Sequence, residues 1–363
     1  MKPWTRKTLI ALTAPLAFAG LAELAFVASG FRYPPLADPI SVPLPEGYVD
    51  GVPMHARDER ELWIPVPGAL VPWGRDTING DGFRGPELER AKTPGILRIA
   101  ALGDSSTFGF GVEYAECWAG RLAEELGARG VNAEVIDAGV IGSTARMGLE
   151  RYRVRVRPFR PDVVVAAFGA VNEHVGAMIQ SDDALIQSLA FRDTVRGRWS
   201  RWMRSECELV HALAYLVDAS RGGRAAIERA ERERLAWQGR NLAGVANPDW
   251  KGLRRVSPAE YSASLRELHR EVSADGGRLL LLAPGRRSDV YAATPAVLLY
   301  TDATIALARE LAVPWVDGRA VMRAEGAEHD ALFLDPYHPT PEGHRRLAAA
   351  IAEAVADLAR APR

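Results

Sequence analysis

The sequence predicts an α/β fold in which helices cover both faces of a mainly parallel sheet. Three observations lead to this fold class. Short apolar segments alternate with helical segments from Gly95 onward. One of the apolar segments, Asp162–Gly169, is apolar almost throughout, as expected for a strand that is covered on both faces. Polar residues follow three of the strands, at the edge where open α/β sheets bind their ligands.

Five strands are expected in this region, and the helices between them carry recognisable start and stop signals. The strands are Ile96–Leu102, Ala133–Gly139, Asp162–Gly169, Arg278–Gly285 and Val313–Gly318. A helix over Cys117–Gly130 has glycines as stop signals, and the helix before the fourth strand begins with the capping box Ser257–Glu260. The last helix begins at Thr340 and runs to Leu358. This alternation is typical of a parallel sheet between two helical layers.

The first thirty residues differ from the rest of the chain. Lys2, Arg6 and Lys7 precede the apolar run Thr8–Gly30, in which Glu23 is the only charge. About 20 apolar residues are enough for a helix to cross a bilayer. Residues 1–30 are therefore expected to form a transmembrane anchor, with a cleaved signal peptide as the alternative. Either would place the rest of the chain outside the cytoplasm, because the basic flank stays inside.

Two further segments interrupt the regular pattern. Residues 31–94 are expected to form a connector and a hairpin, since eight prolines lie between residues 31 and 70 and Asn-Gly and Asp-Gly pairs follow in Thr77–Gly85. The domain expected over residues 95–363 holds an arginine-rich helical insertion at about 181–255. The insertion is either a cap over the site or a solvated helical hairpin. Its tryptophans Trp199, Trp202 and Trp237 either contact substrate or pack within it.

The composition argues against several classes of function. With 45 basic and 46 acidic residues the net charge is −1, which gives no long-range attraction to nucleic acid. The two cysteines, Cys117 and Cys207, form no Cys-x-x-Cys motif, and the sequence leaves open whether they pair. Motifs for dinucleotides, for nucleotide phosphates and for His-Glu-x-x-His metal sites are missing from the sequence. No cofactor or metal is expected.

Ser105 follows the first strand and is the candidate nucleophile. A serine hydroxyl needs a base, and the base needs a carboxylate to orient it. Of the seven histidines, His338 stands three residues after Asp335, in a proline-stiffened turn just before the last helix. This spacing lets the two side chains meet across the turn, at the same sheet edge as Ser105. The alternative is a helix-entry loop with polar residues that meet by chance.

The oxyanion of an acyl-transfer intermediate needs hydrogen-bond donors that are already in place. The candidates are the backbone N–H groups of Ser105 and Gly142 and the side-chain amide of Asn172. Taken singly, a glycine after a strand usually lies in a turn, and an asparagine in a loop usually caps a helix.

Four short motifs occur together in one order. They are Gly-Asp-Ser-Ser at Gly103–Ser106, the glycine of Val-Ile-Gly-Ser-Thr-Ala, the asparagine of Ala-Val-Asn-Glu, and Asp-Pro-Tyr-His at Asp335–His338. In this respect the chain resembles the GDSL-type SGNH hydrolases, from Ile96 to Leu358. The segment Asn-Gly-Asp-Gly-Phe-Arg-Gly-Pro-Glu further upstream is similar to that of membrane-anchored bacterial members.

The resemblance implies a three-layer flavodoxin-like sandwich with a parallel sheet and a triad of Ser105, His338 and Asp335. It also implies an oxyanion hole formed by Ser105, Gly142 and Asn172, and esters as the substrates.

The chain departs from the family pattern at the third motif, where the usual Gly-x-Asn-Asp reads Gly-Ala-Val-Asn-Glu. One extra residue separates Gly169 from Asn172, and Glu173 replaces the aspartate. In the second motif Gly139 competes with Gly142, which is preferred because the family's donor follows the turn. Thr107 takes the last glycine position of a Gly-x-Ser-x-Gly elbow, which argues against an ordinary α/β-hydrolase.

The expected function is that of a serine esterase at the cell envelope, which works through an acyl-enzyme. Its expected partner is an ester-bearing small molecule, a lipid or an acetylated glycan. One alternative is an O-acetyltransferase or deacetylase that acts on an envelope polysaccharide. The other is a non-enzymatic surface binding module with a dormant site.

Overall fold

The computed structural model describes most of the chain as two compact units. The described residues are 3–31, 48–49, 52–169, 171–174, 181–192, 194–223, 244–323 and 327–360, with a few residues between 225 and 236. One unit consists of Met1–Ser41 and Gln187–Gly239, and the other of Val42–Ile186 and Arg240–Arg363. We refer to them as the helical unit and the sheet unit. The predicted boundary at residue 95 does not separate these units.

The sheet unit is built around five strands in the order β6-β5-β7-β8-β9. All four neighbouring pairs run parallel. The strands are β5 (Leu97–Gly103), β6 (Ala133–Asp137), β7 (Val163–Ala167), β8 (Arg278–Ala283) and β9 (Trp315–Asp317). Each one overlaps a segment that the sequence predicts as a strand, so the predicted parallel sheet is confirmed.

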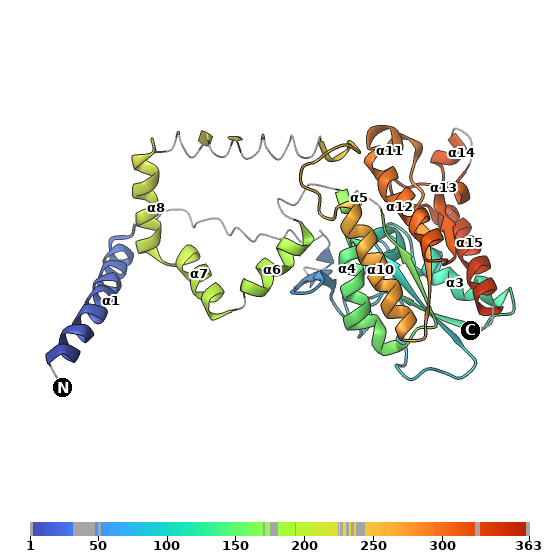
Figure 1. Ribbon diagram of the computed structural model, residues 1–363, viewed down its shortest axis with the longest axis horizontal. Helices are drawn as coiled ribbons and strands as arrows, with labels where there is room; N and C mark the ends of the chain where they lie inside the picture. Colours follow the sequence, from blue (N-terminus) through green and yellow to red (C-terminus); the bar gives the residue numbers. More distant parts are fainter. Residues whose placement is uncertain are drawn as a thin grey trace. The chain divides into compact units, whose positions relative to one another are not determined.

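Helices cover both faces of this sheet (Figure 1). Alternate residues of β5 point to opposite faces, with Ile99 and Ala101 in one core and Ala100 and Leu102 in the other. The first core is closed by α3 (Trp118–Gly127) and α15 (Pro341–Arg360). The second core is closed by α4 (Ala145–Arg151), α10 (Pro258–Ala274) and α12 (Ala296–Glu310). The sheet therefore lies between two helical layers, as the predicted three-layer sandwich requires.

The strand order places the carboxyl end of β5 at a topological switch point. The chain leaves β5 to form β6 on one side and then crosses to β7 on the other side. Loops diverge at such a point and leave room for a ligand. Short helical turns occupy this edge and the remaining loops. They are α2 (Ser105–Phe108), α5 (Val171–His174), α11 (Ser288–Ala293), α13 (Gly318–Val321), α14 (Ala327–Asp330), η1 (Tyr114–Glu116), η2 (Tyr152–Val156) and η3 (Arg157–Phe159).

The predicted helix starts of α10 and α15 are confirmed. In the capping box of α10, Ser257 Oγ accepts a hydrogen bond from the Glu260 N–H at 3.3 Å. The Glu260 side chain accepts one from the Ser257 N–H at 2.8 Å. At α15, Thr340 Oγ1 accepts a hydrogen bond from the Gly343 N–H at 3.3 Å. These bonds satisfy backbone donors that have no partner within the helix.

The segment before the sheet differs from the predicted extended connector wherever the structure describes it. Its strands are β1 (Tyr48–Val49), β2 (Val52–Pro53), β3 (His55–Asp58) and β4 (Leu62–Pro65). Met54, Val71 and Ile78 bury their side chains in a small core with Phe108 of α2. Apolar residues between the prolines thus pack this segment onto the sheet unit. Residues 32–47, which hold five of the eight prolines, lie outside the described residues.

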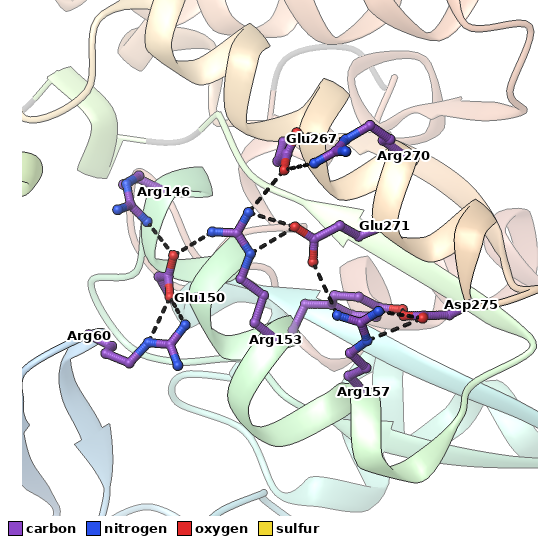
Figure 2. Close-up of polar contacts among 10 residues, drawn as sticks. Arg60, Arg146, Glu150, Arg153, Arg157, Glu267, Arg270, Glu271 and Asp275 are labelled. Atoms are coloured by element: carbon purple, nitrogen blue, oxygen red, sulfur yellow. Dashed lines mark hydrogen bonds and ion pairs between the residues drawn. The ribbon is translucent and has the colours of Figure 1, made fainter.

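Ion pairs reinforce the packing of this segment against the helices (Figure 2). The carboxylate of Glu150 in α4 contacts three guanidinium groups. Arg60, in the β3–β4 turn, and Arg153 each lie 2.6 Å from it, and Arg146 lies at 3.0 Å. Arg153 also lies 2.6 Å from Glu271 of α10. The network therefore links the upstream hairpin to two helices of one layer.

The helical unit contains α1 (Pro3–Ser29), α7 (Val195–Ser205) and α8 (Glu208–Ser220), and α6 (Asp182–Arg192) leads into it. The insertion is thus largely helical from Asp182 to Ser220, whereas residues 246–255 form turns and irregular chain, and Trp237 lies outside the described residues. Glu23 of α1 caps α8, because its carboxylate accepts hydrogen bonds from the N–H groups of Glu208 at 2.9 Å and Leu209 at 2.7 Å.

The structure bears on the predicted transmembrane helix and on the state of the two cysteines. Within the described part of the chain, no helix combines the length and the apolar character needed to cross a membrane. The expected transmembrane anchor is therefore not supported, although α1 forms a helix there. Cys117 and Cys207 are both buried free thiols.

Candidate active site

The turn that follows β5 presents Ser105. Asp104 is the N-cap of α2, and its Oδ1 accepts a hydrogen bond from the Ser106 N–H at 2.9 Å. Ser105 is the first residue of α2 and is partly exposed. Gly103 is needed for this close turn, because a Cβ there would lie 2.7 Å from the Ala167 carbonyl oxygen of β7. The turn thereby holds the Ser105 hydroxyl at the carboxyl end of the sheet.

The turn before α15 brings a histidine to this hydroxyl. Asp335 Oδ1 accepts hydrogen bonds from the N–H groups of Tyr337 at 2.7 Å and His338 at 2.9 Å, which fixes the turn. Asp335 Oδ2 lies 2.6 Å from His338 Nδ1. His338 Nε2 lies 2.8 Å from Ser105 Oγ, although the two residues are 233 positions apart. His338 is therefore within hydrogen-bond distance of both Ser105 and Asp335, the other two residues proposed from the sequence.

The charge of Asp335 determines where the histidine carries its proton. Partial burial acts to raise the pKa of Asp335, but hydrogen bonds from the His338 side chain and the Tyr337 N–H lower that pKa to about 2. An ionised carboxylate can only accept hydrogen bonds, so Nδ1 of His338 carries a proton. Nε2 of the neutral ring is then left to accept the hydrogen bond of the Ser105 hydroxyl. This is the arrangement of a general base beside a nucleophile.

Gly142, the predicted oxyanion donor, has a left-handed backbone conformation. Its φ is +73°, in the left-handed region that favours glycine. Arg255 donates to the Gly142 carbonyl at 2.9 Å, and the Trp63 indole donates to the Ile141 carbonyl at 2.8 Å. Among the described residues, none accepts a hydrogen bond from the Gly142 N–H. The competing Gly139 instead donates its N–H to the Asp137 carboxylate at 3.0 Å.

Asn172 and Glu173 lie in α5, beside the turn that carries Ser105. Asn172 Nδ2 lies 3.5 Å from Asp104 Oδ2, so the described contact of this amide is with Asp104 and not with Ser105. Glu173 is buried, and its Oε1 accepts hydrogen bonds from the N–H groups of Gly169 and Ala145, both at 3.2 Å. Burial, and then the charge of Asp104, raise the pKa of Glu173 to about 8. Glu173 thus joins the end of β7 to the start of α4 as a mostly neutral acid.

Arg286 is a site residue that the sequence analysis missed. It follows β8 and is buried, and its Nη1 donates to the Tyr337 carbonyl at 3.2 Å. The same nitrogen lies 3.4 Å from Ser106 Oγ, and Nη2 lies 3.6 Å from Asp104 Oδ2. Arg286 therefore connects the turn that carries Ser105 to the turn that carries His338. The signal in the sequence is its position: Arg286 directly follows the fourth predicted strand, as the other candidates follow the first three.

The upstream segment also reaches the surroundings of His338. The Phe110 ring stacks on the His338 imidazole with centroids 4.3 Å apart, and Trp73 packs on Phe110 at 4.5 Å. The Trp73 indole donates to the Gly109 carbonyl at 3.1 Å, and Arg84 donates to the same carbonyl at 2.7 Å. Arg84 belongs to the Asn-Gly-Asp-Gly-Phe-Arg-Gly motif, which the sequence predicted only as a turn. The segment thus supports the loop that packs against the histidine.

The site does not include a metal centre in the part of the chain that the structure describes. There, no three histidine, cysteine, aspartate or glutamate side chains gather in a way that could hold a metal ion. The buried Cys117 is not a competing nucleophile, because burial raises the pKa of its thiol to about 12.

Comparisons with known proteins place the site in context. The sequence model of the GDSL-like lipase/acylhydrolase family matches residues 101–346. A search of curated proteins gave no match. Solved structures with a similar fold include Axe2, an acetylxylan esterase from Geobacillus stearothermophilus. It has 15% identity and a TM-score of 0.43, over 71% of this chain and 94% of that one. Another is the lipase/acylhydrolase from Enterococcus faecalis, with 17% identity and a TM-score of 0.45, over 72% of this chain and 97% of that one.

Proposed function

Because the chain belongs to the GDSL-like lipase/acylhydrolase family and is an ester hydrolase, we propose that Ser105, His338 and Asp335 are its catalytic triad. The observation that carries this proposal is the continuous pair of hydrogen bonds from Ser105 Oγ through His338 to Asp335, at 2.8 and 2.6 Å. Such a chain of contacts gives a serine hydroxyl a base and gives the base a fixed orientation.

The reaction proceeds through an acyl-enzyme. Ser105 Oγ attacks the ester carbonyl carbon while His338 Nε2 takes the hydroxyl proton, and Asp335 stabilises the imidazolium that forms. His338 then gives this proton to the leaving alcohol oxygen as the ester C–O bond breaks, which leaves the acyl group on Ser105. Water attacks the acyl carbon with His338 as base, and the acid is released with Ser105 restored.

The oxyanion of each tetrahedral intermediate is held by the N–H groups of Ser105 and Gly142 and by Asn172. Support comes from the left-handed turn at Gly142, whose carbonyl is fixed by Arg255. An asparagine amide has two N–H donors, so a long contact with Asp104 leaves the second donor for the oxyanion. Loss of one such donor typically costs on the order of 10²–10³ in kcat.

The substrate is proposed to be an ester-bearing small molecule, lipid or acetylated glycan outside the cytoplasm. Support for the location comes from the basic residues Lys2, Arg6 and Lys7 ahead of the apolar run Thr8–Gly30. The predicted O-acetyltransferase differs from the hydrolase only in the acceptor, a sugar hydroxyl in place of water. The predicted dormant binding module is set aside, because the family and its activity are shown.

A comparison of two neighbouring serines tests the proposal. We expect Ser105→Ala to lower kcat for short p-nitrophenyl esters by at least about 10⁴-fold, because in the described part of the chain no other hydroxyl is paired with His338. Ser106→Ala is the matched control: its Oγ lies near Arg286 and the Tyr337 carbonyl, so a change within about tenfold is expected. A fluorophosphonate probe should label the wild type and the Ser106 variant but not the Ser105 variant.

The proposal fails if the Ser105 variant keeps its turnover, or if both variants lose turnover equally while folded by circular dichroism. Product analysis with an acetylated glycan and a free sugar acceptor separates the two reactions. Free acetate alone means hydrolysis, and acetylated acceptor means transfer.

A further inference from the structure

Helix α7 presents an aromatic face to the surroundings of the helical unit. Val195, Trp199 and Trp202 stand at positions i, i+4 and i+7, so their side chains share one face of the helix. They are 76%, 59% and 42% exposed. The two indole rings lie side by side, with centroids 5.1 Å apart. Single exposed apolar residues are common, but a continuous patch of this kind marks an interaction surface.

Positive charge surrounds the aromatic face. Arg196, Arg198 and Arg204 of α7 are exposed, and the first two flank the tryptophans on the helical wheel. No acidic residue occurs from Val195 to Ser205 in the sequence. The surface of α7 therefore combines an apolar stripe with a local excess of positive charge.

Other helices of the same unit extend the apolar surface. Leu213, Leu216 and Val217 of α8 are exposed and lie at i, i+3 and i+4. Both α7 and α1 pack against α8. Glu23 of α1 holds the first turn of α8. The unit thus contains several helices with exposed apolar side chains, and α7 combines such side chains with exposed arginines.

We propose that the helical unit binds the surface of an anionic phospholipid bilayer through α7. Trp199 and Trp202 lie at the boundary between headgroups and acyl chains, where indole rings are favoured. The arginines contact lipid phosphates, which match the guanidinium group. A neutral glycan would leave the arginines without an anionic partner, and a second copy of α7 would bring like charges together. The proposal does not depend on the ester chemistry of the sheet unit.

Vesicle binding by the intact protein tests this surface. The full chain is mixed with phosphatidylcholine vesicles that contain or lack phosphatidylglycerol, and bound protein is measured by flotation. We expect Trp199→Ser with Trp202→Ser to weaken binding to the anionic vesicles about tenfold. Arg196→Gln with Arg198→Gln should weaken it about tenfold at low salt, with a smaller difference at high salt. Trp315→Ser and Arg270→Gln, exposed positions of the sheet unit, are the matched controls and should bind unchanged.

A second readout separates α7 from the apolar helix α1. Lipids with brominated acyl chains quench tryptophans that enter the bilayer. The variant Trp199→Phe with Trp202→Phe should still bind, but it should lose the quenching seen in the wild type. The proposal is overturned if quenching is the same in both proteins, or if the serine variant binds as the wild type does. It is also overturned if the serine substitutions change only the oligomeric state by light scattering, since the face would then join two copies.

Discussion

Two carboxyl groups at the carboxyl end of the sheet differ in charge: Asp335 is ionised and Glu173 is mostly neutral. Asp335 is partly exposed and accepts three hydrogen bonds from His338 and Tyr337, and its pKa is lowered to about 2. Glu173 is buried beside Asp104, and its pKa is raised to about 8. At neutral pH the first is an anion that fixes the orientation of His338, and the second is a mostly neutral acid that joins two loops. Burial and the number of donors determine the difference.

We expect Glu173→Gln to flatten the pH dependence of stability. Because the folded-state pKa is raised, the contribution of Glu173 is greatest below its unfolded pKa and is lost as pH rises toward about 8. Glutamine resembles the protonated acid and has no such loss, so the variant should gain stability relative to the wild type between about pH 5 and pH 8. Urea unfolding of both proteins across this pH range measures the difference in their free energies of unfolding.

The matched control for Glu173→Gln is Glu342→Gln. Glu342 is exposed, and hydrogen bonds from Arg345 and Arg346 lower its pKa to about 2, so it should show no such gain. A Glu173 variant that is less stable than the wild type at about pH 8 would mean that the charged form is the one that stabilises the fold.

At the scale of secondary-structure elements, one buried carboxylate links the upstream hairpin to the helices that support the site. Glu150 of α4 contacts Arg60 in the β3–β4 turn, and it contacts Arg153, which continues to Glu271 of α10 (Figure 2). The same hairpin region supplies Trp73, which packs on the Phe110 ring that stacks on His338. Docking of this segment therefore affects the position of the base.

We expect Glu150→Gln to lower the free energy of unfolding by about 1–3 kcal/mol, because arginines that converge on one site lose their shared anion. Burial acts to raise the pKa of Glu150, but hydrogen bonds from Arg153, Arg60 and Arg146 lower it. With a lowered folded-state pKa, this contribution is present above the unfolded pKa of about 4.3 and is lost as pH falls below it. The difference between variant and wild type should therefore shrink in acid, as urea unfolding can measure.

Glu310→Gln is the control for this network, since Glu310 pairs with Arg266 on the surface and such a pair contributes about 0–1 kcal/mol. Equal losses for the two variants would contradict the special role of Glu150.

At the scale of the whole molecule, the chain divides its tasks between two units. The sheet unit contains the candidate triad, and the helical unit contains α1 and the aromatic face of α7. The helical unit is formed by the first 41 residues together with a segment far along the chain, Gln187–Gly239. The apolar N-terminal sequence therefore belongs to the same unit as Gln187–Gly239, the central part of the insertion.

We expect residues 1–30 to direct the protein out of the cytoplasm. A fusion of these residues to an alkaline phosphatase, which is active only outside the cytoplasm, should be active in a bacterial host. Replacing Lys2, Arg6 and Lys7 by glutamate should lower that activity, because basic residues hold the leading end inside. An inactive phosphatase would contradict the proposed location, and the mass of the fusion shows whether the segment is cleaved.

The fold class and the residues of the candidate triad could be predicted from the sequence because each depends on short-range patterns. The apolar run Val163–Ala167 and the capping box at Ser257 specify a strand and a helix start by their own residues. The parallel sheet then brings the carboxyl ends of the strands to one edge, so that Ser105 and His338 meet although they are 233 positions apart.

Other features were decided only by tertiary structure, because they depend on contacts between distant segments. Arg286 follows a strand, as Ser105 does, but its contacts with Tyr337 and Asp104 join segments that lie far apart in the sequence. The proline-rich stretch reads locally as a connector, yet Trp73 and neighbouring apolar side chains pack it onto α2. The sequence by itself thus determined the strands and the pairing of Ser105 with His338. Tertiary packing decided which side chains support them, since burial and long-range hydrogen bonds exist only once the segments have come together.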